Sequence, residues 1–71
     1  SMKILLSLVI CSAVEGICMP PYTWPNQFNT MYDCLTFGYE ESSKKMKELG
    51  RKDVNKYELY IKFNCQPLST I

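Results

Sequence analysis

Residues 57–66, YELYIKFNCQ, alternate strictly between apolar and polar side chains. Because successive side chains of a β-strand point to opposite faces, this stretch predicts a strand with one buried face and one face toward water. The predicted buried face carries Tyr57, Leu59, Ile61, Phe63 and Cys65. Such a strand is stable only beside other strands and beneath a covering layer, so the rest of the chain has to supply both.

The N-terminal run over residues 3–14 is the predicted partner strand. It is rich in Ile, Leu and Val and is apolar on both faces, which is typical of a buried central strand. The better core face carries Ile4, Leu6, Leu8, Ile10 and Val14, and the other includes Leu5 and Val9. Because that second face is also apolar, we expect another copy of the chain to cover it, with Leu5 and Val9 as interface candidates.

The same segment also has the outline of a secretory signal, with one positive charge, a short apolar run and small residues in residues 2–16. In addition, residues 8–11, LVIC, resemble a lipidation site at Cys11. Cleavage after Gly16 would leave three cysteines, so one of them would have no partner for a disulfide bond. The bulky Ile10 just before Cys11 does not suit lipidation. We therefore favour a strand that is retained in the mature protein.

A helix is predicted over residues 26–49, with Gly50 at its end. Apolar or small residues recur there at spacings of three, four and seven, which places them on one stripe. The stripe consists of Phe28, Met31, Tyr32, Leu35, Tyr39, Ser42, Met46 and Leu49. Two adjacent prolines make residues 18–25 a stiff connection before the helix, and residues 51–56 are predicted as a polar loop after it.

These elements predict one small α+β domain over residues 1–71, in which Ser1 is interpreted as left by an expression tag. The predicted helix would span about 36 Å and a strand of ten residues about 33 Å, so the helix is long enough to return the chain to a parallel second strand. We therefore expect a β-α-β order with a right-handed crossover. A hairpin within residues 3–20, with its bend near Ser12–Gly16, would give the alternative order β-β-α-β. Either sheet is small, so we expect a homo-oligomer that completes it.

Four cysteines in so short a chain predict disulfide bonds and an oxidising compartment, either periplasmic or extracellular. They are Cys11, Cys18, Cys34 and Cys65, and the parallel order brings them to the same end of the domain. One possible pairing joins Cys18 to Cys34 and Cys11 to Cys65. However, Cys11 and Cys65 should point to opposite faces of the sheet unless a bulge changes the register. Cys34–Cys65 is the alternative, and it leaves Cys11 and Cys18 to pair or to stay free.

No catalytic residue, metal ligand or cofactor-binding residue is predicted. The chain has no histidine, which removes the commonest general base and metal ligand. Six residues separate the closest cysteines, whereas zinc knuckles and redox couples use two. We therefore expect a protein that is not an enzyme. A pocket lined by Asp33, Glu40 or Cys34 would favour the opposite interpretation.

Six basic residues lie within thirteen positions late in the helix and in the following loop: Lys44, Lys45, Lys47, Arg51, Lys52 and Lys56. Cations favour a helix C-terminus, and neither a glycine-rich loop nor an aromatic RNA-binding motif accompanies them. The net charge of +1 also gives no general attraction to nucleic acid or to an anionic membrane. The sequence therefore favours a protein partner over nucleic acid or a membrane.

Three aromatic residues are further interface candidates. Phe37 falls opposite the apolar stripe of the helix, and Tyr60 lies on the polar face of the second strand. Large exposed aromatic side chains are typical of interfaces. Trp24 is expected mainly to cover the start of the helix.

The stretches CMPP, MYDCLTFGYEESSKKMKELG and DVNKYELYIKFNC resemble small uncharacterised proteins of marine bacteria and their phages. The resemblance covers most of the chain and implies a bacterial or phage origin and a retained N-terminal segment, but no activity and no site residues. We expect a non-enzymatic binding or interaction module, for example a phage accessory protein that acts on a host component. The alternative is a secreted, periplasmic or lipid-anchored structural factor in which residues 2–16 act as a signal.

Overall fold

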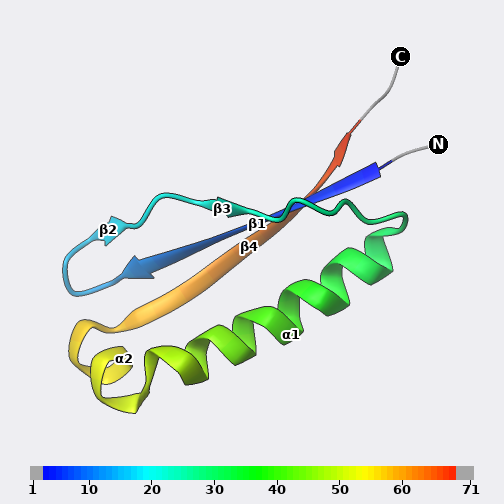
Figure 1. The fold of residues 1–71 in the computed structure, drawn as a ribbon. Coiled ribbons are helices and arrows are strands. Elements are labelled where there is room, and N and C mark those ends of the chain that lie inside the picture. The colour runs from blue at the N-terminus through cyan, green and yellow to red at the C-terminus, as the bar shows by residue number, and fades with distance from the viewer. Residues whose placement is uncertain (1–2, 69–71) are drawn as a thin grey trace.

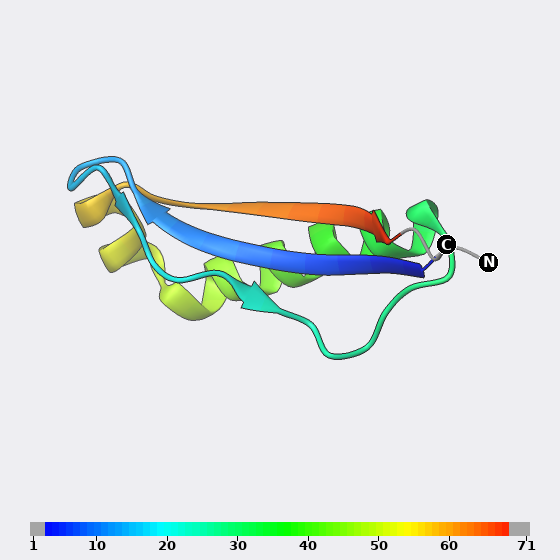
Figure 2. The same ribbon diagram turned by 90° about the horizontal axis from the view of Figure 1, so that it is seen from above.

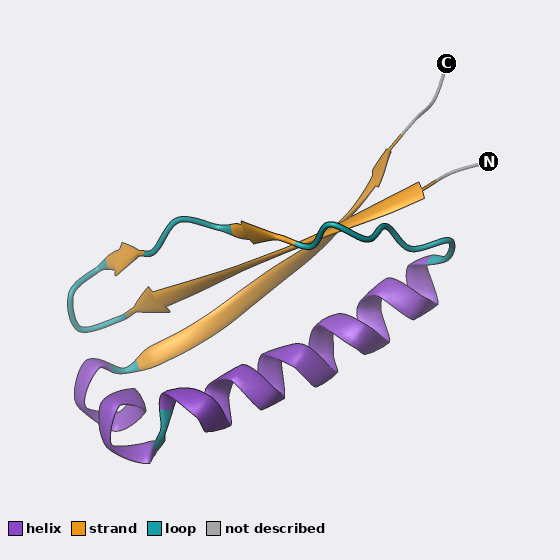
Figure 3. Cartoon of the chain, in the orientation of Figure 1, coloured by secondary structure: helices purple, strands orange, loops and turns teal. Residues whose placement is uncertain are grey.

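The computed structural model describes residues 3–68, in which a four-stranded sheet is covered on one face by a long helix (Figures 1 and 3). The small α+β fold with one long helix on a small sheet is therefore confirmed. Along the chain, the elements are β1 (Lys3–Ser12), β2 (Ile17–Cys18), β3 (Tyr22–Thr23), α1 (Met31–Leu49), α2 (Arg51–Tyr57) and β4 (Leu59–Leu68).

β1 is the central strand of the sheet. One of its edges pairs antiparallel with β4 over the whole strand, from Lys3 opposite Leu68 to Ser12 opposite Leu59. Its other edge pairs antiparallel with β2 and β3, which lie on the side of β1 away from β4 (Figure 1). Figure 2 shows the same for β3 from above. Because both edges of β1 carry hydrogen bonds, the sheet can be extended only from β4 or from the β2–β3 side.

The expected parallel β-α-β order is wrong, and the alternative with an early hairpin is confirmed. Residues 13–16 form the turn, where Gly16 has a φ of 68° that favours glycine. The chain then runs back along β1 to Phe28, whose backbone N–H and C=O both bond to Ile4. As a result α1 starts beside the N-terminal end of β1 and runs in the direction of β1, so β4 has to return antiparallel.

The returning segment contains a β-bulge at its two prolines. Between the residue pairs of β1 with β2 and those of β1 with β3, the register shifts by one residue. The additional residue lies at Pro20–Pro21, opposite Val9. Proline has no N–H to donate, and bulges at sheet edges tolerate it. The β2–β3 edge is therefore short and interrupted.

Both ends of the predicted helix differ in the structure. α1 begins at Met31 because residue 28 is bonded to β1, and Thr30 caps the helix by accepting a hydrogen bond of 3.1 Å from the Asp33 N–H. After Gly50, which has a φ of 89°, residues 51–57 form the short helix α2. A loop was expected over residues 51–56, and Tyr57 was expected in the strand, which begins only at Leu59.

The packed face of α1 is rotated away from the predicted stripe. Cys34 and Gly38 are buried, whereas four members of the stripe are exposed: Met31, Tyr32, Leu35 and Tyr39. Phe37 was predicted to lie opposite the packed face, but it packs on the core, with its ring centroid 5.7 Å from that of Trp24 and 5.3 Å from that of Phe28. The rotation occurs because the Cys34 sulfur reaches the sheet and Gly38 allows a close approach.

The core lies between α1 and the inner face of the sheet and is small. Ile4, Leu6 and Cys34 are its buried members. Around them pack Trp24, Phe28, Phe37, Phe63 and Cys65. The predicted alternation of the last strand is confirmed over residues 59–66, where the apolar side chains are half-buried and the polar ones exposed. The strand continues through residue 68, two residues past the predicted end.

Cys11 pairs with Cys18, and Cys34 pairs with Cys65. The second bond is the alternative that links the helix to the sheet, and Cys11 and Cys65 do point to opposite faces. The four cysteines do not gather at one end, because antiparallel β4 brings Cys65 opposite Leu6. One disulfide therefore closes the first hairpin, while the other ties α1 to β4.

Gly38→Ala is expected to destabilise the protein, because the new Cβ would lie 2.6 Å from Phe63 Cδ2 and would displace the ring. We expect a loss of about 1–3 kcal/mol in the free energy of unfolding, measured by denaturant titration. In a Phe63→Leu background the same substitution should lower that free energy by less, because the aromatic ring is absent. An equal loss in both backgrounds would contradict the close approach of α1 to β4.

The two disulfides are expected to differ in their effect on stability, because Cys34–Cys65 spans 31 residues and Cys11–Cys18 spans seven. By loop-closure entropy, replacing both cysteines by alanine should lower the free energy of unfolding by about 3.7 kcal/mol for the first pair and about 2.5 kcal/mol for the second. Denaturant titration of the two double variants checks the order. A larger loss for the Cys11–Cys18 pair would contradict it.

Candidate binding groove

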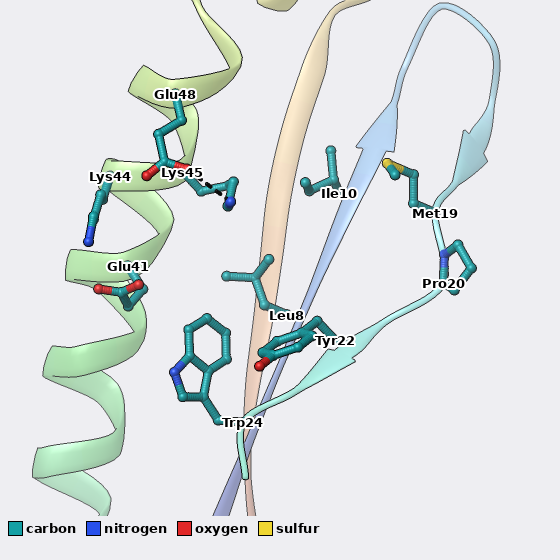
Figure 4. A pocket seen from close by; sticks show the side chains of 10 residues that line it. All are labelled: Leu8, Ile10, Met19, Pro20, Tyr22, Trp24, Glu41, Lys44, Lys45 and Glu48. Carbon is teal, nitrogen blue, oxygen red and sulfur yellow. Dashed lines mark hydrogen bonds and ion pairs between the residues drawn. The ribbon is translucent and has the colours of Figure 1, made fainter. Parts of the chain in front are cut away.

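A groove opens between α1 and the segment that carries β2 and β3, with a volume of about 430 Å³ (Figure 4). We call it the α1–β3 groove. Leu8 and Ile10 of β1 form its floor. The groove exists because the short β2–β3 edge extends the sheet past the part that α1 covers.

The wall on the sheet side is apolar and aromatic. Met19, Pro20, Tyr22 and Trp24 form it. Tyr22 lies opposite Leu8 in the sheet, so its side chain is on the inner face, and Trp24 follows on the same face. The Tyr22 and Trp24 rings pack edge to face with centroids 4.9 Å apart, and Trp24 packs in turn on Phe37. This aromatic series joins the wall to the core.

The opposite wall belongs to α1 and is charged, with Glu41, Lys44, Lys45 and Glu48. Lys45 Nζ lies 3.0 Å from Glu48 Oε1. The hydrogen bond and positive charge of Lys45 lower the pKa of Glu48 below its ordinary value. Each acid on this wall has a base within one helical turn, so the groove combines an apolar floor with a rim of balanced charge.

The predicted basic patch is divided in the structure. Lys44 and Lys45 line the α1–β3 groove. The other four members are exposed elsewhere on the two helices: Lys47, Arg51, Lys52 and Lys56. Lys56 Nζ lies 5.2 Å from the centroid of the Tyr57 ring, which is a cation–π distance. Of the six residues, only Lys44 and Lys45 therefore contribute to the groove.

The predicted interface residues fall in three places. Trp24 lies in the groove and packs against the core, and Phe37 lies in the core. The other three are on the outer face of the sheet, away from α1, because Leu5 and Val9 alternate with the core residues of β1 and Tyr60 pairs with Cys11. Leu5 and Val9 are half-buried there, and Tyr60 is 42% exposed.

The three residues that would have favoured an enzyme do not meet in a pocket. Cys34 is in a disulfide, Asp33 lies in the capped first turn of α1, and Glu40 is exposed outside the groove. Within residues 3–68, no cluster of three or more acidic or cysteine side chains is arranged to hold a metal ion.

Sequence patterns did not identify Leu8, Ile10, Met19 and Tyr22 as groove residues. The first two were assigned to a fully covered core face, because the predicted topology had no strand beside β1 on this side. The available signal was Pro20–Pro21 followed by two aromatic residues, since such a segment is stiff and presents large side chains at a sheet edge.

No family model matches the chain, and comparisons with curated proteins and with solved structures also gave no match. None of the helices in the described part of the chain is long and apolar enough to cross a membrane.

Lys45→Met is expected to raise the pKa of Glu48 toward the ordinary value of a glutamic acid, because it removes the hydrogen bond and the charge that lower it. Titration of the Glu48 carboxyl carbon by NMR measures this pKa. Lys47→Met is the matched control and should leave it unchanged. The same Glu48 pKa in the Lys45→Met variant and in the unaltered protein would contradict the ion pair.

Proposed function

We propose that the protein is a non-enzymatic interaction module that binds an extended, apolar segment of a partner protein in the α1–β3 groove. The observation that carries the proposal is the combination of an apolar floor, an aromatic wall and a charged wall in one open groove of about 430 Å³. Ligand pockets in proteins commonly have volumes of roughly 300–1,000 Å³ and a few convergent polar groups, and the anchoring side chains of protein interfaces also fill pockets.

The charge distribution favours a peptide over nucleic acid. Glu41 and Glu48 flank the two lysines of the helical wall, so the groove lacks the unbalanced positive charge that attracts phosphates. Lys44 has no hydrogen-bond partner among residues 3–68 and is the cation that remains for a ligand. A large apolar side chain followed by an acidic one therefore fits the groove best.

The position of β1 supports a retained N-terminal segment in this proposal. Removal of residues 2–16 would take away the strand to which every other strand is bonded. Cys11 is 1% exposed and bonded to Cys18, so its sulfur is occupied and does not suit a lipid anchor. The two disulfides support action in an oxidising compartment. If the resemblance to bacterial and phage proteins holds, the partner is a component of a host cell.

Peptide selection tests the groove. A display library of random peptides is selected on the immobilised protein, and each enriched peptide is titrated while the fluorescence of Trp24, the only tryptophan, is recorded. We expect enriched peptides to contain an aromatic or large aliphatic residue beside an acidic one. Their binding should change the Trp24 emission, because the indole lines the groove.

Two substitutions at exposed residues serve as the matched pair. Tyr22→Asp places a charge inside the groove and should raise the Kd of an enriched peptide at least tenfold. Ile17→Asp makes a similar change in the hairpin, outside the groove, and should leave the Kd unchanged. Equal affinity of both variants, or a library without enriched peptides, would overturn the proposal.

A further inference from the structure

The outer edge of β4 carries backbone groups without partners among residues 3–68. The Ala13 N–H donates to the Glu58 C=O, so these two residues form a hydrogen-bonded pair. Hydrogen-bonded pairs recur at every second residue of an antiparallel ladder, so the even-numbered residues of β4 bond to β1. The odd-numbered residues direct their N–H and C=O groups away from β1, and these are Leu59, Ile61, Phe63, Cys65 and Pro67. Pro67 fits the strand because its position faces this open edge and needs no donor.

An apolar surface of α1 lies beside this edge. We call it the α1 flank, and it consists of Met31, Tyr32, Leu35, Tyr39 and Met46. Glu41, Lys44 and Glu48 occupy the opposite side of the helix, toward β3, so the α1 flank faces the β4 side. The Tyr39 ring packs edge to face on Phe63 of β4, with centroids 4.8 Å apart. Tyr39 is nevertheless 67% exposed and Tyr32 74% exposed.

The chain exposes more surface than its mass requires. Its accessible area is 5289 Å², whereas a compact monomer of 8.3 kDa exposes about 4,600 Å². Its radius of gyration is 13.7 Å, against about 11 Å for a compact domain of 71 residues. The excess area is comparable with the roughly 800 Å² that each partner buries in a standard specific interface.

We propose that a second copy of this chain pairs with the outer edge of β4, antiparallel about a two-fold axis, and that the α1 flanks of the two copies cover each other. A two-fold interface brings the same surface of both copies together, so the surface must complement itself. The α1 flank contains no charged residue, and the two copies therefore meet there without charge repulsion. The β2–β3 edge is unsuited to this role because it is short and bulged at two prolines.

The side chains of β4 favour one register. In an antiparallel pair of identical strands, a two-fold axis through Lys62 would place the two lysines opposite each other, which is unfavourable. An axis through Phe63 places Lys62 opposite Asn64 of the second copy instead. It also lets the outward groups of Ile61 bond with those of Cys65 across the axis. The Phe63-centred register therefore joins the two sheets without placing like charges opposite each other.

The mass in solution tests the proposal. Sedimentation equilibrium of the oxidised full chain should give twice the 8.3 kDa of one chain. Leu35→Glu should return the mass to one chain, because it buries a charge in the α1 flank, and its 37% exposure allows the fold to tolerate the change. Ile17→Glu, at a residue 63% exposed in the distant hairpin, should remain a dimer. A wild-type mass of one chain at millimolar concentration, or loss of the dimer in both variants, would overturn the proposal.

Amide hydrogen exchange tests the strand pairing separately. In the wild type, the amides of Ile61, Phe63 and Cys65 should exchange at least tenfold more slowly than in Leu35→Glu, because only the dimer gives them acceptors. The amides of Tyr60 and Lys62 bond to β1 and should be protected in both proteins, which shows that the variant is folded. Fast exchange at Ile61 and Phe63 in a dimeric wild type would overturn pairing through β4.

Discussion

The hydrogen bonding of β1 on both edges is the constraint on which the structure depends. Each other strand bonds only to β1, and the helices approach the sheet through the β1–β4 pair. Few side chains are fully buried, and most of those belong to β1. A core of this size gives a small domain little margin, so the two disulfides hold the parts that the core does not. One attaches the returning segment to β1, and the other attaches α1 to β4.

The α1–β3 groove follows from the same arrangement. Gly38 and the Cys34–Cys65 bond hold α1 close over β4, and the sheet continues on the other side of β1 through β2 and β3. One helix cannot cover both halves of the inner face. Ile10 is therefore covered only in part, and the aromatic residues of the returning segment form a wall instead of a lid. The groove and the α1 flank lie on opposite sides of one helix, so binding in the groove and pairing through β4 do not compete.

The sequence predicted elements better than their arrangement. Alternation of apolar and polar residues identified the last strand, and the apolar run identified β1, because both patterns arise from burial along a single strand. The favoured parallel topology was wrong, and the early hairpin remained only the alternative, because residues 18–29 contain little regular structure, although they return the chain along β1. A connection held by a few hydrogen bonds to β1 leaves no periodic pattern in the sequence.

The packed face of the helix was predicted incorrectly for a related reason. Hydrophobic periodicity favoured Tyr32, Leu35 and Tyr39, whereas the packed face is marked by a cysteine and a glycine, which the predicted stripe did not include. Phe37 was misplaced by the same rotation. The sequence could not decide between the possible disulfide pairings, because they depend on whether the last strand runs parallel or antiparallel to the first. The groove was not predicted for both reasons. Its sheet side can be recognised only with the hairpin, and its charged wall only with the correct rotation of α1.

The pairing of β1 with β4 also determines the order in which the fold can be completed during synthesis. Lys3 bonds beside Leu68, so the central strand leaves the ribosome long before its main partner exists. Cys18 follows Cys11 by seven positions, and the first hairpin can therefore be oxidised early, whereas Cys65 has to be made before a disulfide can hold α1 to the sheet. Contacts between distant segments form slowly, and the apolar residues of β1 stay uncovered in the meantime. Until β4 has been made, the returning segment is therefore the only part of the described chain that can pair with β1.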